Sequence, residues 1–158
     1  MLSIVAIAIV RCLLVLLFLP FSALDKVLNF EAAVGQAAQA ARSRPLAILL
    51  IVGGFSIEVL MSLAVVSGVF DRLAALVLAL YCILTALLWK RFWREPDFRL
   101  RGASRGRDLF WDFWKNLALA GGFLVLALGT SANAARRFWH DPLASTHPYQ
   151  LHQSVDSP

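Results

Sequence analysis

Apolar residues fall into four long blocks along the chain, separated by shorter polar stretches. The blocks cover about residues 2–24, 46–70, 73–89 and 113–130. Each is close to the ~20 residues that a helix needs to cross the hydrocarbon core of a bilayer. A stretch such as LAALVLALYCILTALLW lacks the polar alternation of a barrel strand. Because backbone groups in lipid need partners within the chain, the pattern predicts an all-α membrane protein with four spanning helices.

The composition fits this class of protein. Of the 158 residues, 59% are hydrophobic and 16% are charged, which is more apolar than a typical soluble domain. A net charge of +5 could indicate nucleic-acid binding, but the basic residues lie in the loops between the apolar blocks. Membrane topology explains that distribution better, so we expect no nucleic-acid partner.

The first apolar block could be taken for a secretory signal. However, no Lys or Arg precedes it, Arg11 interrupts its apolar core, and no A-x-A cleavage pattern follows Pro20. We therefore expect this block to stay in the protein as the first spanning helix.

Lys and Arg are concentrated in the first and third loops, and this asymmetry predicts the orientation of the chain. The first loop has Lys26, Arg42 and Arg44, the third has Lys90, Arg91, Arg94, Arg99, Arg101, Arg105 and Arg107, and the opposite side has Arg72, Arg136 and Arg137. By the positive-inside rule, loops 25–45 and 90–112 face the cytoplasm and both termini lie outside.

The segments outside the spans have patterns of their own. In the first loop, apolar residues recur at helical spacing, which predicts a short interfacial helix after the first span. These residues are Val27, Phe30, Val34, Ala37 and Ala41. Pro45 marks the start of the second span, and Gly68 with Asp71 marks a tight turn into the third. We predict a four-helix domain over 1–130, followed by a polar, partly disordered tail over 131–158.

Two charged residues inside the spans point to a polar site. Glu58 lies near the centre of the second span and Arg11 near the middle of the first, where charges are costly unless they are paired. Gly54 and Ser62 share the helix face of Glu58 and leave room for a helix or a ligand. We expect Arg11 and Glu58 to meet, either as an ion pair that fixes helix register or as a site for a polar head group, a proton or a quinone.

A second polar layer is expected nearer the cytoplasmic side. Lys115 and Asn116 open the fourth span at the predicted level of Asp25 and Lys26. Lys115 can also be read as a side chain that snorkels to the surface, whereas the shorter Asn116 is expected to face inward.

Several kinds of site have no signal in this sequence. The predicted spans contain no His, which excludes ordinary bis-His haem ligation in the membrane. His140, His147 and His152 in the tail match no zinc motif, so we expect no metal site. No phosphate-binding loop, dinucleotide fingerprint or catalytic Ser/His/Asp set is present either. We therefore expect a protein that is not an enzyme on its own and that holds no cofactor, unless it binds a quinone.

The order of these features resembles the DoxX family of small bacterial membrane proteins with a four-helix bundle. The resemblance covers roughly residues 8–130 and rests on Arg11, Lys26, IEVLMSLAVVSGVFDRLAAL and WKNLALAGGFLVL. The sequence departs from the family where Ser22 replaces a usual Gly, and its third loop is unusually long and basic. The resemblance implies the bacterial inner membrane. Some relatives are subunits of thiosulfate:quinone oxidoreductase or are associated with oxidative-stress complexes.

Three functional hypotheses follow. The leading one is a non-catalytic membrane subunit or anchor of a redox or stress-response system, with a quinone-sized pocket lined by Arg11, Glu58 and Asn116. The second is a small permease or lipid-handling protein that uses Glu58, and the third is a structural interaction module. The expected partners are the lipid bilayer, a membrane or cytoplasmic redox partner at the basic loop 90–112, and a second copy of the chain.

Overall fold

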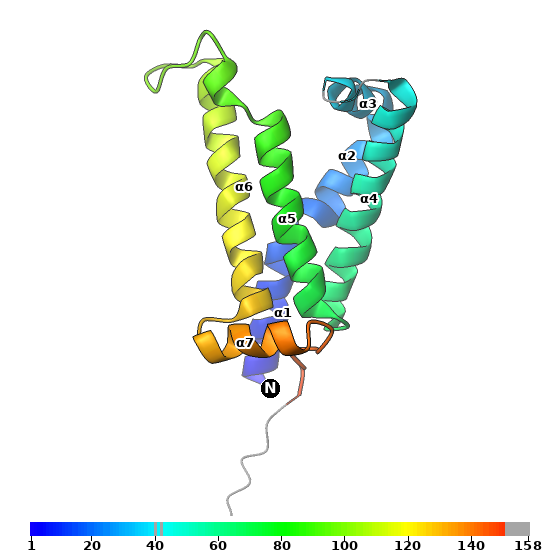
Figure 1. The fold of residues 1–158 in the computed structure, drawn as a ribbon, viewed down its shortest axis with the longest axis vertical. Coiled ribbons are helices and arrows are strands. Elements are labelled where there is room, and N and C mark those ends of the chain that lie inside the picture. Colours follow the sequence, from blue (N-terminus) through cyan, green and yellow to red (C-terminus); the bar gives the residue numbers. More distant parts are fainter. Residues whose placement is uncertain (40, 42, 151–158) are drawn as a thin grey trace, which may run out of the picture.

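The computed structural model describes residues 1–39, 41 and 43–150, and in this part of the chain every regular element is a helix (Figure 1). Arg42 of the first basic loop and His152 of the predicted tail lie outside the described residues. The elements are α1 (Leu2–Val15), a π-helical segment (Leu17–Ser22), α2 (Ala23–Leu28), α3 (Phe30–Ala38), α4 (Arg44–Ser67), α5 (Asp71–Trp89), a 3-10 turn (Phe92–Arg94), α6 (Arg105–Leu128) and α7 (Ala132–His140).

Within the part of the chain that the structure describes, four helical stretches are long and apolar enough to cross a membrane. They are Leu2–Leu28, Arg44–Ser67, Asp71–Arg94 and Arg105–Leu128. The prediction of an all-α protein with four spans is therefore confirmed. The fourth helix begins earlier than its apolar block, because the Ser104 hydroxyl caps it by accepting a bond from the Arg107 amide.

The first span is bent near its middle. Pro20 has no N–H to donate, and Leu19 leaves the helical region with φ −124° and ψ 110°. The Leu19–Pro20 peptide bond is cis. Beyond the bend, α2 leans onto α4, so Lys26 comes close to the middle of the second span.

The helices form two arms that meet at one end. Figure 1 shows α4 and α5 close together at their lower ends and separated at their upper ends, with α6 beside α5 and with α2 and α3 beside α4. As predicted, the turn between α4 and α5 contains Gly68, whose φ of 81° favours glycine. The predicted helix in the first loop also forms, as α3, and it packs Val34 and Ala37 against Ala47.

The core lies where α5 and α6 pack along each other. Small residues of α5, including Ala75 and Ala79, are fully buried and allow the two helices to approach closely. Phe123 of α6 fills the remaining space, and its ring centroid lies 5.9 Å from that of Phe18.

The chain after the fourth span covers the lower end of the bundle, although its polar composition predicts a partly disordered tail. Helix α7 runs across this end in Figure 1 and buries Phe138. The Arg72 guanidinium connects α6 to α7 by donating to the carbonyls of Ala127 in α6 and Ala134 in α7, each at 2.9 Å. The segment 141–150 continues over the α4–α5 turn, where the Ser145 hydroxyl donates to the Gly68 carbonyl. The final residues of the predicted tail, 151–158, lie outside the described residues.

Candidate ligand-binding site

Three helices contribute to a polar cluster around Glu58. The Lys26 ammonium from α2 lies 2.8 Å from each carboxylate oxygen of Glu58, and the Tyr81 hydroxyl from α5 donates to Oε1 at 2.8 Å. Lys26 also donates to the Ser22 hydroxyl, one turn earlier, at 2.7 Å. Glu58 is only 2% exposed, so it depends on partners within the protein. Lys26 balances its charge, and Lys26 and Tyr81 supply its hydrogen bonds.

Arg11 does not belong to this cluster, so the predicted pairing of Arg11 with Glu58 is wrong. Its guanidinium lies 2.6 Å from the carboxylate of Asp71 and also donates to the Val65 carbonyl at 2.6 Å. Thr146 completes this second cluster, because its hydroxyl accepts from Arg11 and its amide donates to Asp71. The reason is depth: the start of α1 extends below the lower ends of α4 and α5 in Figure 1. Arg11 therefore lies beside the α4–α5 turn, away from the middle of α4.

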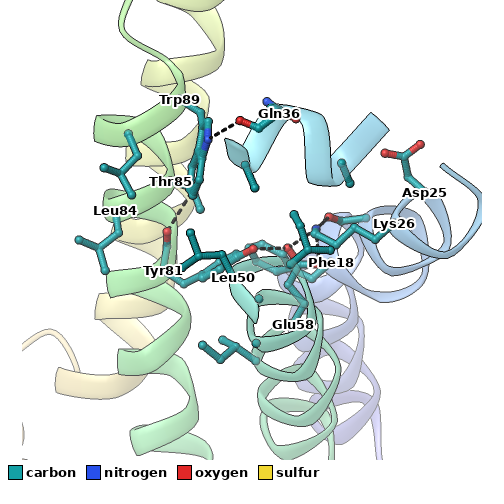
Figure 2. Close-up of a pocket in the computed structure, with 18 of the residues that line it drawn as sticks. Phe18, Asp25, Lys26, Gln36, Leu50, Glu58, Tyr81, Leu84, Thr85 and Trp89 are labelled. Carbon is teal, nitrogen blue, oxygen red and sulfur yellow. Dashed lines mark hydrogen bonds and ion pairs between the residues drawn. The ribbon is translucent and has the colours of Figure 1, made fainter. Parts of the chain in front are cut away.

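A cavity of about 740 Å³ lies between the two arms, above Glu58. Figure 2 shows Phe18, Glu58 and Tyr81 at its inner end and Trp89 near Gln36 at the other. The indole N–H of Trp89 donates to the backbone carbonyl of Gln36 at 3.3 Å and so connects α5 to α3. The walls between these ends are mainly apolar side chains and short alanines and glycines of α3, α4 and α5.

Two adjacent glycines shape the α4 side of the cavity. A Cβ atom at Gly53 would meet nothing within 4 Å, so that position faces open space. At Gly54 a Cβ atom would lie 3.0 Å from the Tyr81 hydroxyl, so the glycine lets the tyrosine reach Glu58. The expectation that the helix face of Glu58 leaves room is confirmed at Gly54.

Comparison with known proteins places this chain in a family. Residues 6–91 match the DoxX family, and this range includes Lys26, Glu58 and Tyr81. The chain belongs to the DoxX family. Over 124 residues it is 30% identical to the inner membrane protein YphA of Escherichia coli (strain K12). The aligned stretch covers 78% of this chain and 82% of that protein. No solved structure matches it. With its four apolar helices, this DoxX protein is a multi-pass protein of the inner membrane.

The other predicted site residues of this DoxX protein are divided between the cavity and its surroundings. Asn116 and Asp25 line the cavity, and Asp25 also accepts from the Asn29 amide at 2.7 Å. The side chain of Lys115 is 75% exposed and lies 3.5 Å from the Asp112 carboxylate, so it is outside the cavity. Ser62 is fully buried below Glu58, and its hydroxyl has no hydrogen-bond partner among the described residues.

Sequence reasoning placed two partners of the charged residues incorrectly. The sequence pattern predicts Lys26 in a separate layer with Asp25, yet Lys26 binds Glu58. Asp71 was interpreted only as a turn residue, although it is fully buried against Arg11. Two signals could have found both pairs. Glu58 and Asp71 supply two acids for the two bases Arg11 and Lys26, and the long, flexible stem of lysine lets its ammonium reach a distant partner.

The Glu58 cluster of this DoxX protein offers both kinds of hydrogen-bonding group to a ligand. Lys26 and Tyr81 are donors, while the carboxylate of Glu58 is an acceptor. A ligand carbonyl could accept from Lys26, and a ligand hydroxyl could donate to Glu58. The inner end of the cavity therefore suits a small polar head group, and its walls suit an apolar body.

Proposed function

We propose that this protein binds an isoprenoid quinone or quinol in the cavity between its two arms and serves a redox system as a non-catalytic membrane subunit. The observation that carries the proposal is the cavity with the Lys26–Glu58–Tyr81 cluster at its inner end. Its volume of about 740 Å³ lies within the range of roughly 300–1,000 Å³ that is usual for small-molecule sites.

The head-group chemistry supports a quinone more than a purely apolar ligand. A quinone carbonyl accepts hydrogen bonds, and Lys26 would supply one in exchange for its bond to the Ser22 hydroxyl. The hydroxyl of a quinol donates a hydrogen bond, which the Glu58 carboxylate would accept. The Phe18 ring lies beside Tyr81 with a centroid separation of 6.1 Å, so the head group would also meet aromatic surface.

The walls support a ligand with a long apolar tail. Leucines on both arms line the cavity and are also between 41% and 66% exposed, so they face the cavity and the lipid together. These residues are Leu49 and Leu50 on α4 and Leu84 and Leu88 on α5. A tail that leaves between α4 and α5 would therefore remain in apolar surroundings throughout.

The test is to fill the cavity and measure quinone binding. Trp89 lines the cavity, so a bound short-chain quinone should quench its fluorescence in a saturable way, with the protein in nanodiscs. Gly53→Phe places a ring in the open space and should weaken binding at least about tenfold, since the quinone and the ring cannot share the site.

Gly121→Phe is the matched control. Gly121 lies on α6, is exposed and is outside the cavity lining. A Cβ atom at this position would also meet nothing within 4 Å, so quinone affinity should stay at the wild-type value. Quenching that does not saturate, or that is equally strong in Gly53→Phe, would reject a quinone site here.

A second candidate function is the movement of a polar-headed lipid or another small substrate. Its supporting observation is that Glu58, a group able to carry a proton, lies directly on the same cavity. Proton-coupled flux into liposomes that is lost in Glu58→Gln would favour this function over a quinone-binding subunit. If neither flux nor ligand binding is found, a structural interaction module remains.

A further inference from the structure

The basic loop, residues 90–112, is a second feature that the cavity does not explain. It has seven basic residues and four acidic ones, which are Glu95, Asp97, Asp108 and Asp112. Figure 1 shows it reaching out sideways from the upper ends of α5 and α6. It is far from the α7 end and contributes only Lys90 to the cavity lining.

The loop has a defined fold, because polar groups fix its junction with α6. The Asp97 carboxylate accepts from the backbone amides of Arg105 and Gly106, at 2.8 and 3.0 Å, and so caps the start of α6. Gly106 is buried, and a Cβ atom there would lie 2.8 Å from the Cα atom of Phe98. The loop therefore packs too closely on α6 to accept any larger residue at position 106.

An aromatic cluster joins the same loop to α6. The Phe92 ring lies within 5.1 to 5.6 Å of the rings of Trp93, Phe98, Phe110 and Phe113. Trp93, Trp111 and Trp114 remain about half exposed, at 49% to 50%. Indole rings with this partial exposure are enriched at the head-group level of bilayers.

Three of the four acidic residues of the loop already have partners, whereas several of its arginines have no carboxylate partner. Asp97 caps α6, Glu95 lies 3.7 Å from Arg105, and Asp112 lies 3.1 Å from Lys90. Among the residues that the structure describes, Arg94 and Arg101 have no carboxylate within 4 Å, and both are exposed. The loop therefore presents guanidinium groups whose charge the protein does not neutralise.

We propose that the basic loop is a docking surface for the phosphate groups of anionic phospholipids. Guanidinium groups bind phosphate oxygens through paired hydrogen bonds, and each basic residue near an anionic membrane surface adds to the attraction. The half-exposed tryptophans and Leu100, which is 62% exposed, place apolar surface beside these charges. This combination fits the boundary between head groups and acyl chains, whereas an acidic soluble protein would leave the indoles in water.

The experiment measures which lipid lies next to the loop. A fluorophore is attached at Ala103→Cys, with Cys12→Ala and Cys82→Ala in the background, and the full chain is placed in phosphatidylcholine nanodiscs. Two samples are compared, and each contains a minor fraction of a lipid with an acyl nitroxide, which quenches the fluorophore at short range. The labelled lipid is phosphatidylglycerol in one sample and phosphatidylcholine in the other. Phosphatidylglycerol should quench at least about twofold more strongly, and high salt should reduce this preference.

Two double variants make the result specific. Arg94→Gln with Arg101→Gln should clearly reduce the preference for phosphatidylglycerol without unfolding the loop, since neither side chain has a protein partner among the described residues. Arg136→Gln with Arg137→Gln removes the same charge from exposed positions on α7 at the other end and should leave the preference unchanged.

Three outcomes would overturn the proposal. They are equal quenching by both lipids in the wild type, a preference that is unchanged by loss of Arg94 and Arg101, and no quenching by either lipid. The last would place the loop away from the bilayer and favour an acidic protein partner. None of these substitutions falls on a residue that lines the cavity, so the result is independent of quinone binding.

Discussion

Lys26 and Glu58 stand 32 residues apart in the sequence, yet the lysine ammonium lies 2.8 Å from each of the two carboxylate oxygens. The bend at Leu19 brings α2 against α4 and makes this contact possible. A different ion pair, between Arg11 and Asp71, lies beside the α4–α5 turn. The bundle thus contains two separate buried charge pairs, one at the cavity and one at the end covered by the segment 141–150.

Double-mutant cycles should distinguish the true charge pairs from the one expected from sequence. Lys26→Met and Glu58→Gln should each lower the stability of the protein in detergent by about 3 to 5 kcal/mol, since each leaves a buried polar group without its partner. The double variant should lose less than the sum, by at least about 1 kcal/mol.

Arg11→Leu with Glu58→Gln is the control cycle, and its two effects should add within about 0.5 kcal/mol because the residues do not touch. The quantity to follow is the free energy of unfolding. Coupling in this control cycle, together with simple additivity for Lys26 and Glu58, would contradict this arrangement of the charged residues.

The orientation inferred from the basic loops can be tested by cysteine labelling in spheroplasts that lack the two native cysteines. We expect Leu143→Cys, exposed beyond α7, to react with an impermeant maleimide in intact spheroplasts. Ala103→Cys in the basic loop should react only after the membrane is permeabilised, since positive loops stay in the cytoplasm. The opposite pattern of labelling would reverse the orientation and place the cavity toward the outer leaflet.

Adding a methyl group at Gly68 tests whether the covering segment, residues 141–150, packs tightly on the α4–α5 turn. The quantity compared is the change in stability relative to the same substitution at an open helix position. Gly68 has a positive φ of 81°, and a Cβ atom there would lie 2.8 Å from the Pro148 ring. Gly68→Ala should therefore destabilise the protein by more than about 1 kcal/mol.

Gly35→Ala in α3 is the matched change, because it adds the same methyl group in a helix with nothing within 4 Å. It should be neutral or stabilise by up to about 1 kcal/mol. Thermal unfolding of both variants in the same detergent gives the comparison, and an equal response would show that Pro148 does not press on the turn.

The spans, the α3 helix and the Gly68 turn were predictable because each depends on a local signal. Long apolar runs, helical spacing around Val34, and a glycine between two runs need no knowledge of distant contacts. The ion pairs were not predictable in the same way, because helical spacing gives the face of a residue but not its depth. Arg11 looked central within its own apolar block, and only the placement of α1 relative to α4 shows that it lies beside the turn.

The α7 helix was missed for a related reason. It is short and contains Arg136 and Arg137, so its apolar content is low, although Phe138 is almost completely buried. Its position depends on Arg72, which the sequence suggested only as a positive charge at a span end. Tertiary hydrogen bonds from one arginine thus order a segment that composition alone describes as a tail.

The bridge between Trp89 and Gln36 has a kinetic consequence. It is a neutral hydrogen bond of 3.3 Å between the two arms, and such a bond contributes only about 1 kcal/mol net. Breaking it leaves every helix intact, so a ligand would not have to wait for any part of the bundle to unfold before it enters or leaves. The residence time of a bound molecule would then be set by its contacts near Glu58, and a change of head group would alter the dissociation rate more than the association rate.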